Sequence, residues 1–163
     1  MVSSAAFHIL GRLANFPKNT SPLLYDYLFL AKELHMAFDI YGPETHLADD
    51  SCDYEMLEFA SSLNKKLPFL EKLLNKFYNS TEVKIQEISL LKCELEFVRK
   101  KYQEKIIPII IKEKRIYSKN RKIYKHIIAQ LLMKDRMYNY LSDFINICDE
   151  ADEKNTTIRC IGD

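Results

Sequence analysis

Apolar side chains recur at a period near 3.5 residues from Ala60 to Phe144. Two rows at that period describe a helix with one long apolar stripe. The chain before Ala60 is too short to cover such a stripe, so we expect a second protein to bury much of it. The predicted partner-interface positions are Ile88, Leu91, Leu95, Val98, Tyr102, Ile109, Ile116, Ile123, Ile127, Met137, Leu141 and Phe144.

Three features interrupt the stripe and predict where the helix changes course. Pro68 predicts a kink or break near Lys66, because proline lacks an amide hydrogen and disfavours helix in the residue before it. The Asn79–Glu82 segment has the spacing of a capping box. It predicts either the start of a new helix or an exposed patch in a continuous one. Pro108, between isoleucines, predicts a second kink or short break.

The N-terminal part has the pattern of a compact helical unit. Ser3 or Ser4 is positioned to cap a first helix that ends at Pro17. A second helix is predicted over residues 22–41, and Gly42-Pro43 stops it. Residues 1–25 carry two basic residues and no acidic one, so a mitochondrial presequence is the alternative to a docked helix here.

These elements predict an all-α fold with a short N-terminal helical bundle followed by long, kinked coiled-coil helices. The bundle is assigned to residues 1–78, the coiled-coil arm to 82–150 and a flexible tail to 151–163. Alternating runs typical of strands are not recognised in the chain. The longest apolar run, around residues 106–111, is too short to cross a membrane.

Charge is distributed unevenly although the net charge is only +1. Eleven Lys or Arg lie between Arg99 and Lys125, against two Glu. A solvated helix face or a protein partner is the favoured interpretation, with nucleic acid and a membrane surface as alternatives. The predicted basic partner-binding patch consists of Lys112, Lys114, Arg115, Lys119, Arg121, Lys122 and Lys125.

One row of the stripe changes character along the chain. The row that holds Leu91 and Val98 continues with Lys105, Lys112 and Lys119. A symmetric parallel homodimer would stack these lysines against each other, whereas an unlike chain can place acidic residues there. The row therefore favours a hetero-oligomer.

Candidate chemical groups are few. His35 and Asp39 are four residues apart on a predicted helix, and His46 precedes Asp49 and Asp50. No third ligand or nucleophile stands at a matching spacing, and acidic residues before a helix usually favour its N-terminus. We therefore expect a non-enzymatic protein with no metal and no cofactor.

The cysteines show no metal-binding or redox spacing. They occur at positions 52, 93, 148 and 160 without a CxxC motif, so reduced thiols are expected.

A helical N-terminal unit followed by a heptad arm, with positions such as Ile88, Leu91, Leu95 and Val98, resembles small subunits of the augmin complex, a spindle microtubule-nucleation factor. Small kinetochore-complex subunits have a similar layout. The resemblance implies a structural role with other coiled-coil subunits, association with microtubules, and a cytoplasmic, spindle or nuclear location. The alternative function is a basic helical module that binds nucleic acid.

Overall fold

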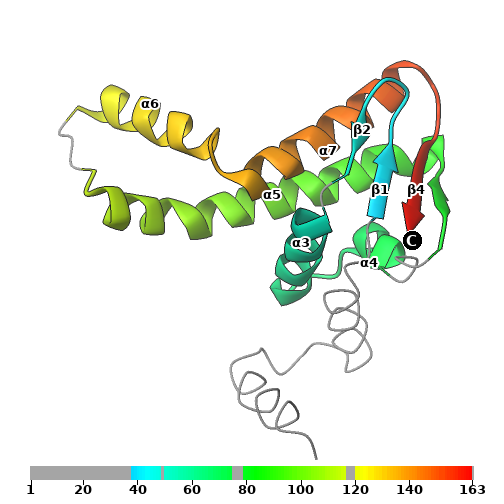
Figure 1. Ribbon diagram of the computed structural model, residues 1–163, viewed down its shortest axis with the longest axis horizontal. Helices are drawn as coiled ribbons and strands as arrows, with labels where there is room; N and C mark the ends of the chain where they lie inside the picture. The colour runs from blue at the N-terminus through cyan, green and yellow to red at the C-terminus, as the bar shows by residue number, and fades with distance from the viewer. Residues whose placement is uncertain (1–37, 49, 75–78, 117–119, 163) are drawn as a thin grey trace, which may run out of the picture.

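The computed structural model of the protein describes residues 38–48, 50–74, 79–116 and 120–162 (Figure 1). This part of the chain contains both helices and short strands. Their order is β1 (Phe38–Tyr41), β2 (His46–Leu47), α3 (Asp50–Ser62), α4 (Pro68–Leu74), β3 (Thr81–Val83), α5 (Ile85–Lys114), α6 (Arg121–Leu132), α7 (Arg136–Glu153) and β4 (Ile158–Gly162).

The four strands form one antiparallel sheet in the order β2-β1-β4-β3. Ile40 of β1 lies opposite Cys160 of β4, and Val83 of β3 lies opposite Ile158. The side chains of these four residues are buried. Arg159, between Ile158 and Cys160, is exposed, and so is Glu82, which lies opposite Arg159 on β3. This alternation is what a sheet with one solvated face requires.

The predicted all-α fold is therefore wrong, and the protein is mixed α and β. Residues 38–41, predicted to end a helix over 22–41, form β1. Residues 22–37, the rest of that predicted helix, lie outside the described residues. The predicted tail 151–163 contains the last turn of α7 and β4. Strand pairing between positions more than 100 residues apart decides these segments, and no local pattern reports it.

Gly42 marks the turn between β1 and β2. Its amide donates a hydrogen bond to the carbonyl of Thr45 (2.8 Å). A Cβ atom at position 42 would lie 2.9 Å from Cγ2 of Ile147 on α7 and 3.1 Å from Oγ1 of Thr45. Glycine therefore lets the hairpin approach α7 closely, and it does not end a helix as the sequence suggested.

The segment 82–150 is not one extended arm. Helix α7 folds back antiparallel to α5, as three contacts along the pair show. Lys92 pairs with Asp149, and the guanidinium of Arg99 donates to Ser142 Oγ (3.2 Å). The Tyr102 hydroxyl donates to Asp135 at the start of α7 (3.3 Å). The chain thus buries much of its own stripe.

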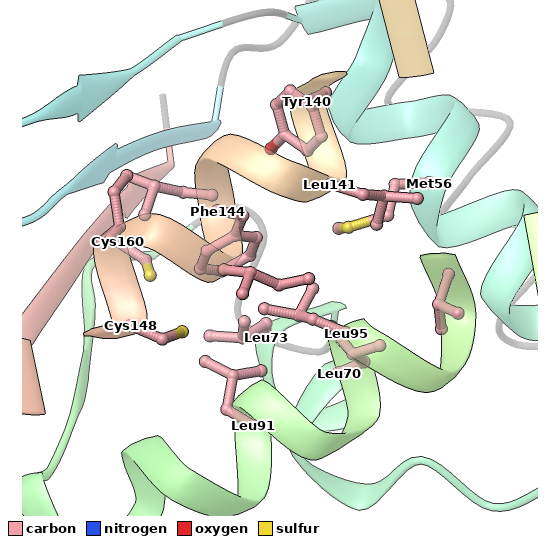
Figure 2. Packing of buried hydrophobic residues seen from close by; sticks show 14 of the residues in the cluster. Met56, Leu70, Leu73, Leu91, Leu95, Tyr140, Leu141, Phe144, Cys148 and Cys160 are labelled. Carbon is pink, nitrogen blue, oxygen red and sulfur yellow. The ribbon is translucent and has the colours of Figure 1, made fainter. Parts of the chain in front are cut away.

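One core joins the sheet to helices α3, α4, α5 and α7, and Figure 2 shows part of it. Described residues from both predicted segments, 1–78 and 82–150, supply this core. Its largest fully buried side chains are Phe38, Phe144, Ile40, Met56, Leu70, Leu73, Ile88, Leu91, Leu95, Leu141, Ile147 and Ile158.

The predicted interruptions have three different outcomes. Helix α3 ends at Ser62 and α4 begins at Pro68, so the break at that proline is confirmed. The segment around Asn79–Glu82 leads into β3, and α5 begins at Ile85, where the carboxylate of Glu87 accepts a hydrogen bond from the Lys84 amide (3.1 Å). Helix α5 continues through Pro108 without a break.

Candidate protein-interaction surface

The two halves of α5 have different surroundings. In residues 85–98, Ile88, Leu91, Leu95 and Val98 are each 0% exposed. In residues 99–114 no side chain is buried. We name the described residues 103–116 and 120–132, which comprise the outer part of α5 and all of α6, the arm, and the remaining described elements the body. Figure 1 shows the arm projecting away from the sheet, beyond α3 and α4.

In the body, α5 is covered by several helices. Helix α7 runs antiparallel along it, and α3 and α4 pack on it as well. The carboxylate of Glu94 accepts the backbone amides of Phe69 (3.1 Å) and Leu70 (2.9 Å) at the start of α4. Burial raises the pKa of Glu94, and the two amide hydrogen bonds oppose that rise by favouring the ionised form.

Tyr102 stands where the body ends. Its ring packs edge-to-face on Phe59 of α3, with centroids 5.5 Å apart, while its hydroxyl reaches Asp135. Burial is the main cause that raises the pKa of Tyr102 above its ordinary value of 10, and the Asp135 carboxylate adds to the shift. The phenol therefore stays neutral and acts as a hydrogen-bond donor.

Beyond Tyr102 the apolar stripe continues with less cover. Seven residues on, Ile109 is 42% exposed, and Ile123 on α6 is 52% exposed. Ile116 and Ile127 are half-buried. Within the arm, only Ile128 and Leu132 are buried, and both lie in the half of α6 nearest the body.

The isoleucines around Pro108 explain this exposure. They occupy positions 106, 107, 109, 110 and 111. Successive residues of a helix are about 100° apart, so these five side chains cover roughly 200° of its circumference. A helix with a single buried face shows an apolar stripe roughly 100° wide. A single neighbouring helix, α6, therefore cannot bury all five isoleucine side chains.

Local interactions fix the far end of the arm. Helix α5 ends at Lys114, and its C-cap residue Arg115 adopts a left-handed conformation (φ 49°, ψ 47°). Asn120 caps α6 by accepting the amides of Lys122 (3.0 Å) and Ile123 (3.4 Å). Lys112 and Lys114 in the last turn of α5 also complement the negative end of its dipole.

The arm is strongly basic. Its described residues 103–116 and 120–132 contain seven Lys or Arg and two Glu, a balance of +5. All seven cationic side chains are exposed. Six of them belong to the predicted basic patch, and they are Lys112, Lys114, Arg115, Arg121, Lys122 and Lys125. The seventh member of that patch, Lys119, lies outside the described residues.

The predicted interface positions thus fall into two groups. The larger group lies in the protein's own core, where a partner does not reach it, and comprises Ile88, Leu91, Leu95, Val98, Met137, Leu141 and Phe144. The other group, in the arm or at its base, is partly or largely exposed and comprises Tyr102, Ile109, Ile116, Ile123 and Ile127. The isoleucines at positions 106, 107, 109, 110 and 111 cover a wide arc of the helix surface. This feature of the sequence could have distinguished the arm from the body.

The candidate chemical groups form no metal cluster in the described part of the chain. His46 stacks on Tyr41 (centroids 4.3 Å apart), and its Nε2 lies 3.6 Å from Asp39 Oδ2. His35 and Asp49 lie outside the described residues. Among the described residues, the partners of His46 are thus Tyr41 and Asp39 of the neighbouring strand β1.

Three of the four cysteines are buried, and Cys93 is exposed. Burial raises the pKa values of Cys148 and Cys160 to about 12. Thiols so protected are protonated at neutral pH and react poorly. Their packing in the core (Figure 2) is a structural role.

Comparisons of the chain with protein-family models, curated proteins and solved structures find no match. Among the described helices, none combines the length and the apolar character that a membrane crossing needs.

Proposed function

We propose that the protein is a non-enzymatic subunit of a larger assembly and that the arm is its attachment site. One observation carries the proposal: α5 keeps its apolar stripe beyond the point where the body stops covering it. In the body, the same stripe reaches 0% exposure where helices α3, α4 and α7 pack on it. A further protein element would cover the arm in the same way, and exposed apolar surface rimmed by polar residues is typical of interaction sites.

The kind of assembly stays a prediction. An augmin-like spindle factor or a kinetochore-type scaffold fits a projecting helical arm with a basic surface, and both place the protein near microtubules. Co-sedimentation of the purified protein with microtubules tests that setting directly. A protein that stays in the supernatant at low salt, where basic patches bind most strongly, contradicts it.

Nucleic-acid binding is the second candidate, and the balance of +5 on the arm supports it. An electrophoretic mobility shift with a short DNA or RNA duplex tests this alternative. Binding whose affinity falls steeply with salt, and which is lost on replacing Lys122 and Lys125 by Glu, would favour it over a protein partner.

The decisive experiment for the assembly role compares exposed apolar positions on the arm and on the body. Ile109→Asp and Ile123→Asp place a charge on the arm, and Leu90→Asp does so at a body position of α5 that is 51% exposed. Each tagged variant is expressed in its native cells, and the size of its complex is measured by gel filtration of the extract.

We expect the wild-type protein and Leu90→Asp to elute in a complex much larger than 19.2 kDa, and the two arm variants to elute as small species. Circular dichroism should show the same helix content in all four proteins, because each substituted side chain is already exposed. A wild-type protein that elutes as a free monomer contradicts the proposed function.

A further inference from the structure

We propose that the arm is completed by one amphipathic helix from a different protein, whose apolar stripe packs on Ile109 and whose carboxylates face Lys105 and Lys112. This inference rests on the proposed function and specifies the chemistry of the partner. It follows from comparing what each row of α5 meets in the body with what the same row offers in the arm.

The body supplies the template for a covering helix. Two rows of α5 point into the core there, one through Ile88 and Leu95 and the other through Leu91 and Val98. Helix α7 runs antiparallel along α5 there, and α3 and α4 pack on α5 as further cover. Such further cover is what the arm lacks among the described residues.

In the arm, the two rows diverge in chemistry. The first continues with Tyr102 and Ile109, so it stays apolar. The second continues with Lys105 and Lys112, and both are exposed. Lys105 Nζ lies 5.0 Å from the Phe59 ring centroid, at the edge of the body. Within the described residues, neither lysine forms an ion pair with a carboxylate.

A covering helix must therefore match one apolar row and one cationic row side by side. An apolar stripe bordered by Asp or Glu does so, because helix positions three and four residues apart lie on one face. A second copy of this chain does not, since its arm would present the same lysines and the same balance of +5. Charge complementarity thus selects an unlike, acidic partner.

The test uses a defined probe rather than an unknown ligand. A fluorescent peptide of about 18 residues, or five helical turns, carries Leu at its stripe positions and Glu beside them. A second peptide replaces every Glu by Lys. Fluorescence anisotropy then measures the binding of each peptide to the full-length protein, at low salt and at about 0.5 M salt, where charges are strongly screened.

The wild-type protein should bind the Glu peptide at least about tenfold more tightly than the Lys peptide, and high salt should reduce that preference. The double variant Lys105→Glu/Lys112→Glu should reverse the preference. The matched control is Lys100→Glu/Lys114→Glu, which changes the net charge equally on the opposite side of α5 and should keep the wild-type preference. Lys105→Gln/Lys112→Gln serves if charge reversal impairs folding, and should abolish the preference.

Several results would overturn the inference. Equal binding of both peptides, or an equal loss in the two double variants, would show that these lysines do not select the partner. Tighter binding to a DNA duplex or to phosphatidylserine vesicles than to the Glu peptide would point to another ligand class. A monomer–dimer equilibrium lost in Ile109→Asp would identify a second copy, and an intrachain cross-link from position 109 to residues 1–37 would identify the chain itself as the cover.

The two proposals can fail separately. If Ile109→Asp leaves the native complex intact, the proposed function fails. If Ile109→Asp dissolves the complex but Lys105→Glu/Lys112→Glu does not, the arm is still the attachment site and only the acidic partner is wrong.

Discussion

The two halves of α5 share one amino-acid pattern and have opposite surroundings. Leu95 and Ile109 belong to the same row, yet the first is 0% exposed and the second is 42% exposed. A heptad pattern therefore indicates that an apolar stripe favours burial. It does not indicate whether the same chain or another chain buries the stripe. In the body the answer is the protein's own helices α3, α4 and α7, and in the arm the stripe is available to a partner.

The largest expected effect is a difference in protein stability between substitutions in the two halves of α5. Leu95→Ala removes a fully buried side chain and should lower the free energy of unfolding by about 2–5 kcal/mol. Ile109→Ala should lower it by about 1 kcal/mol or less, because its side chain already meets water. Urea titration followed by circular dichroism measures both. Equal losses would mean that the arm is as tightly packed as the body.

A second pair of substitutions compares a buried phenol in the body with a half-buried phenol on the arm. The Tyr140 hydroxyl donates to the carboxylate of Asp53, and both residues are buried. Tyr140→Phe should cost about 1–3 kcal/mol, because a buried carboxylate loses a donor. Tyr124→Phe on the arm should change stability by less than about 0.5 kcal/mol. The same urea titration compares them, and a neutral Tyr140→Phe would contradict this role of the hydroxyl.

A third prediction concerns how closely the body is packed at the β1–β2 turn. Gly42→Ala should cost about 1 kcal/mol, because the new methyl group meets Cγ2 of Ile147. The measurement is a double-mutant cycle with Ile147→Ala, in which the cost of Gly42→Ala should shrink. An unchanged cost would place the strain at Thr45 instead.

The smallest effect depends on pH and compares two ion pairs. Lys72 on α4 and Glu87 on α5 are 2.9 Å apart and join two body helices, whereas Lys101 and Glu104 pair within α5 at the base of the arm. The hydrogen bond from Lys72 is the main cause that lowers the pKa of Glu87 below its ordinary value of 4.5. The contribution of Glu87 is therefore present above pH 4.5 and lost as pH falls through the lowered pKa.

Glu87→Gln should accordingly cost at most about 1 kcal/mol at pH 7, since water screens a pair whose lysine is 40% exposed. That difference from the wild-type protein should vanish in acid. Glu104→Gln should have a smaller effect, because its pair fixes no contact between helices. Thermal unfolding across pH 3–7 makes the comparison, and a Glu87→Gln deficit that persists at low pH would contradict the ion-pair explanation.

How well each element could be predicted from the sequence depends on whether the interactions that form it are local or join distant parts of the chain. The helical stripe and the break at Pro68 are local, and both appear in the structure. The sheet is non-local: β1 has four residues and pairs with β4 at the other end of the described chain. The alternation of Ile158, Arg159 and Cys160 was visible, but five residues are too few to predict a strand unaided.

The candidate surface was predictable only in part, for a similar reason. The sequence marked Ile109 and Ile123 together with Leu95 and Phe144, because all four follow one period. Only the packing of α7 against α5 in the structure shows that Leu95 and Phe144 are buried in the protein's own core. The row of lysines through Lys105 and Lys112 can be recognised from the sequence alone. The structure was needed to show that this row lies beside an exposed apolar stripe.

The central place of β4 in the sheet has a consequence for biosynthesis. Strands β1 and β3 do not touch each other, and each pairs with β4. A nascent chain that ends before Ile158 therefore has only the β1–β2 hairpin of this sheet, and it exposes the open edge of β1 together with the face of α7 that β4 contacts. The body can close only after nearly all of the residues up to Gly162 have left the ribosome. Chaperones and proteases would meet the same open body in any truncated product, even one that carries a complete arm.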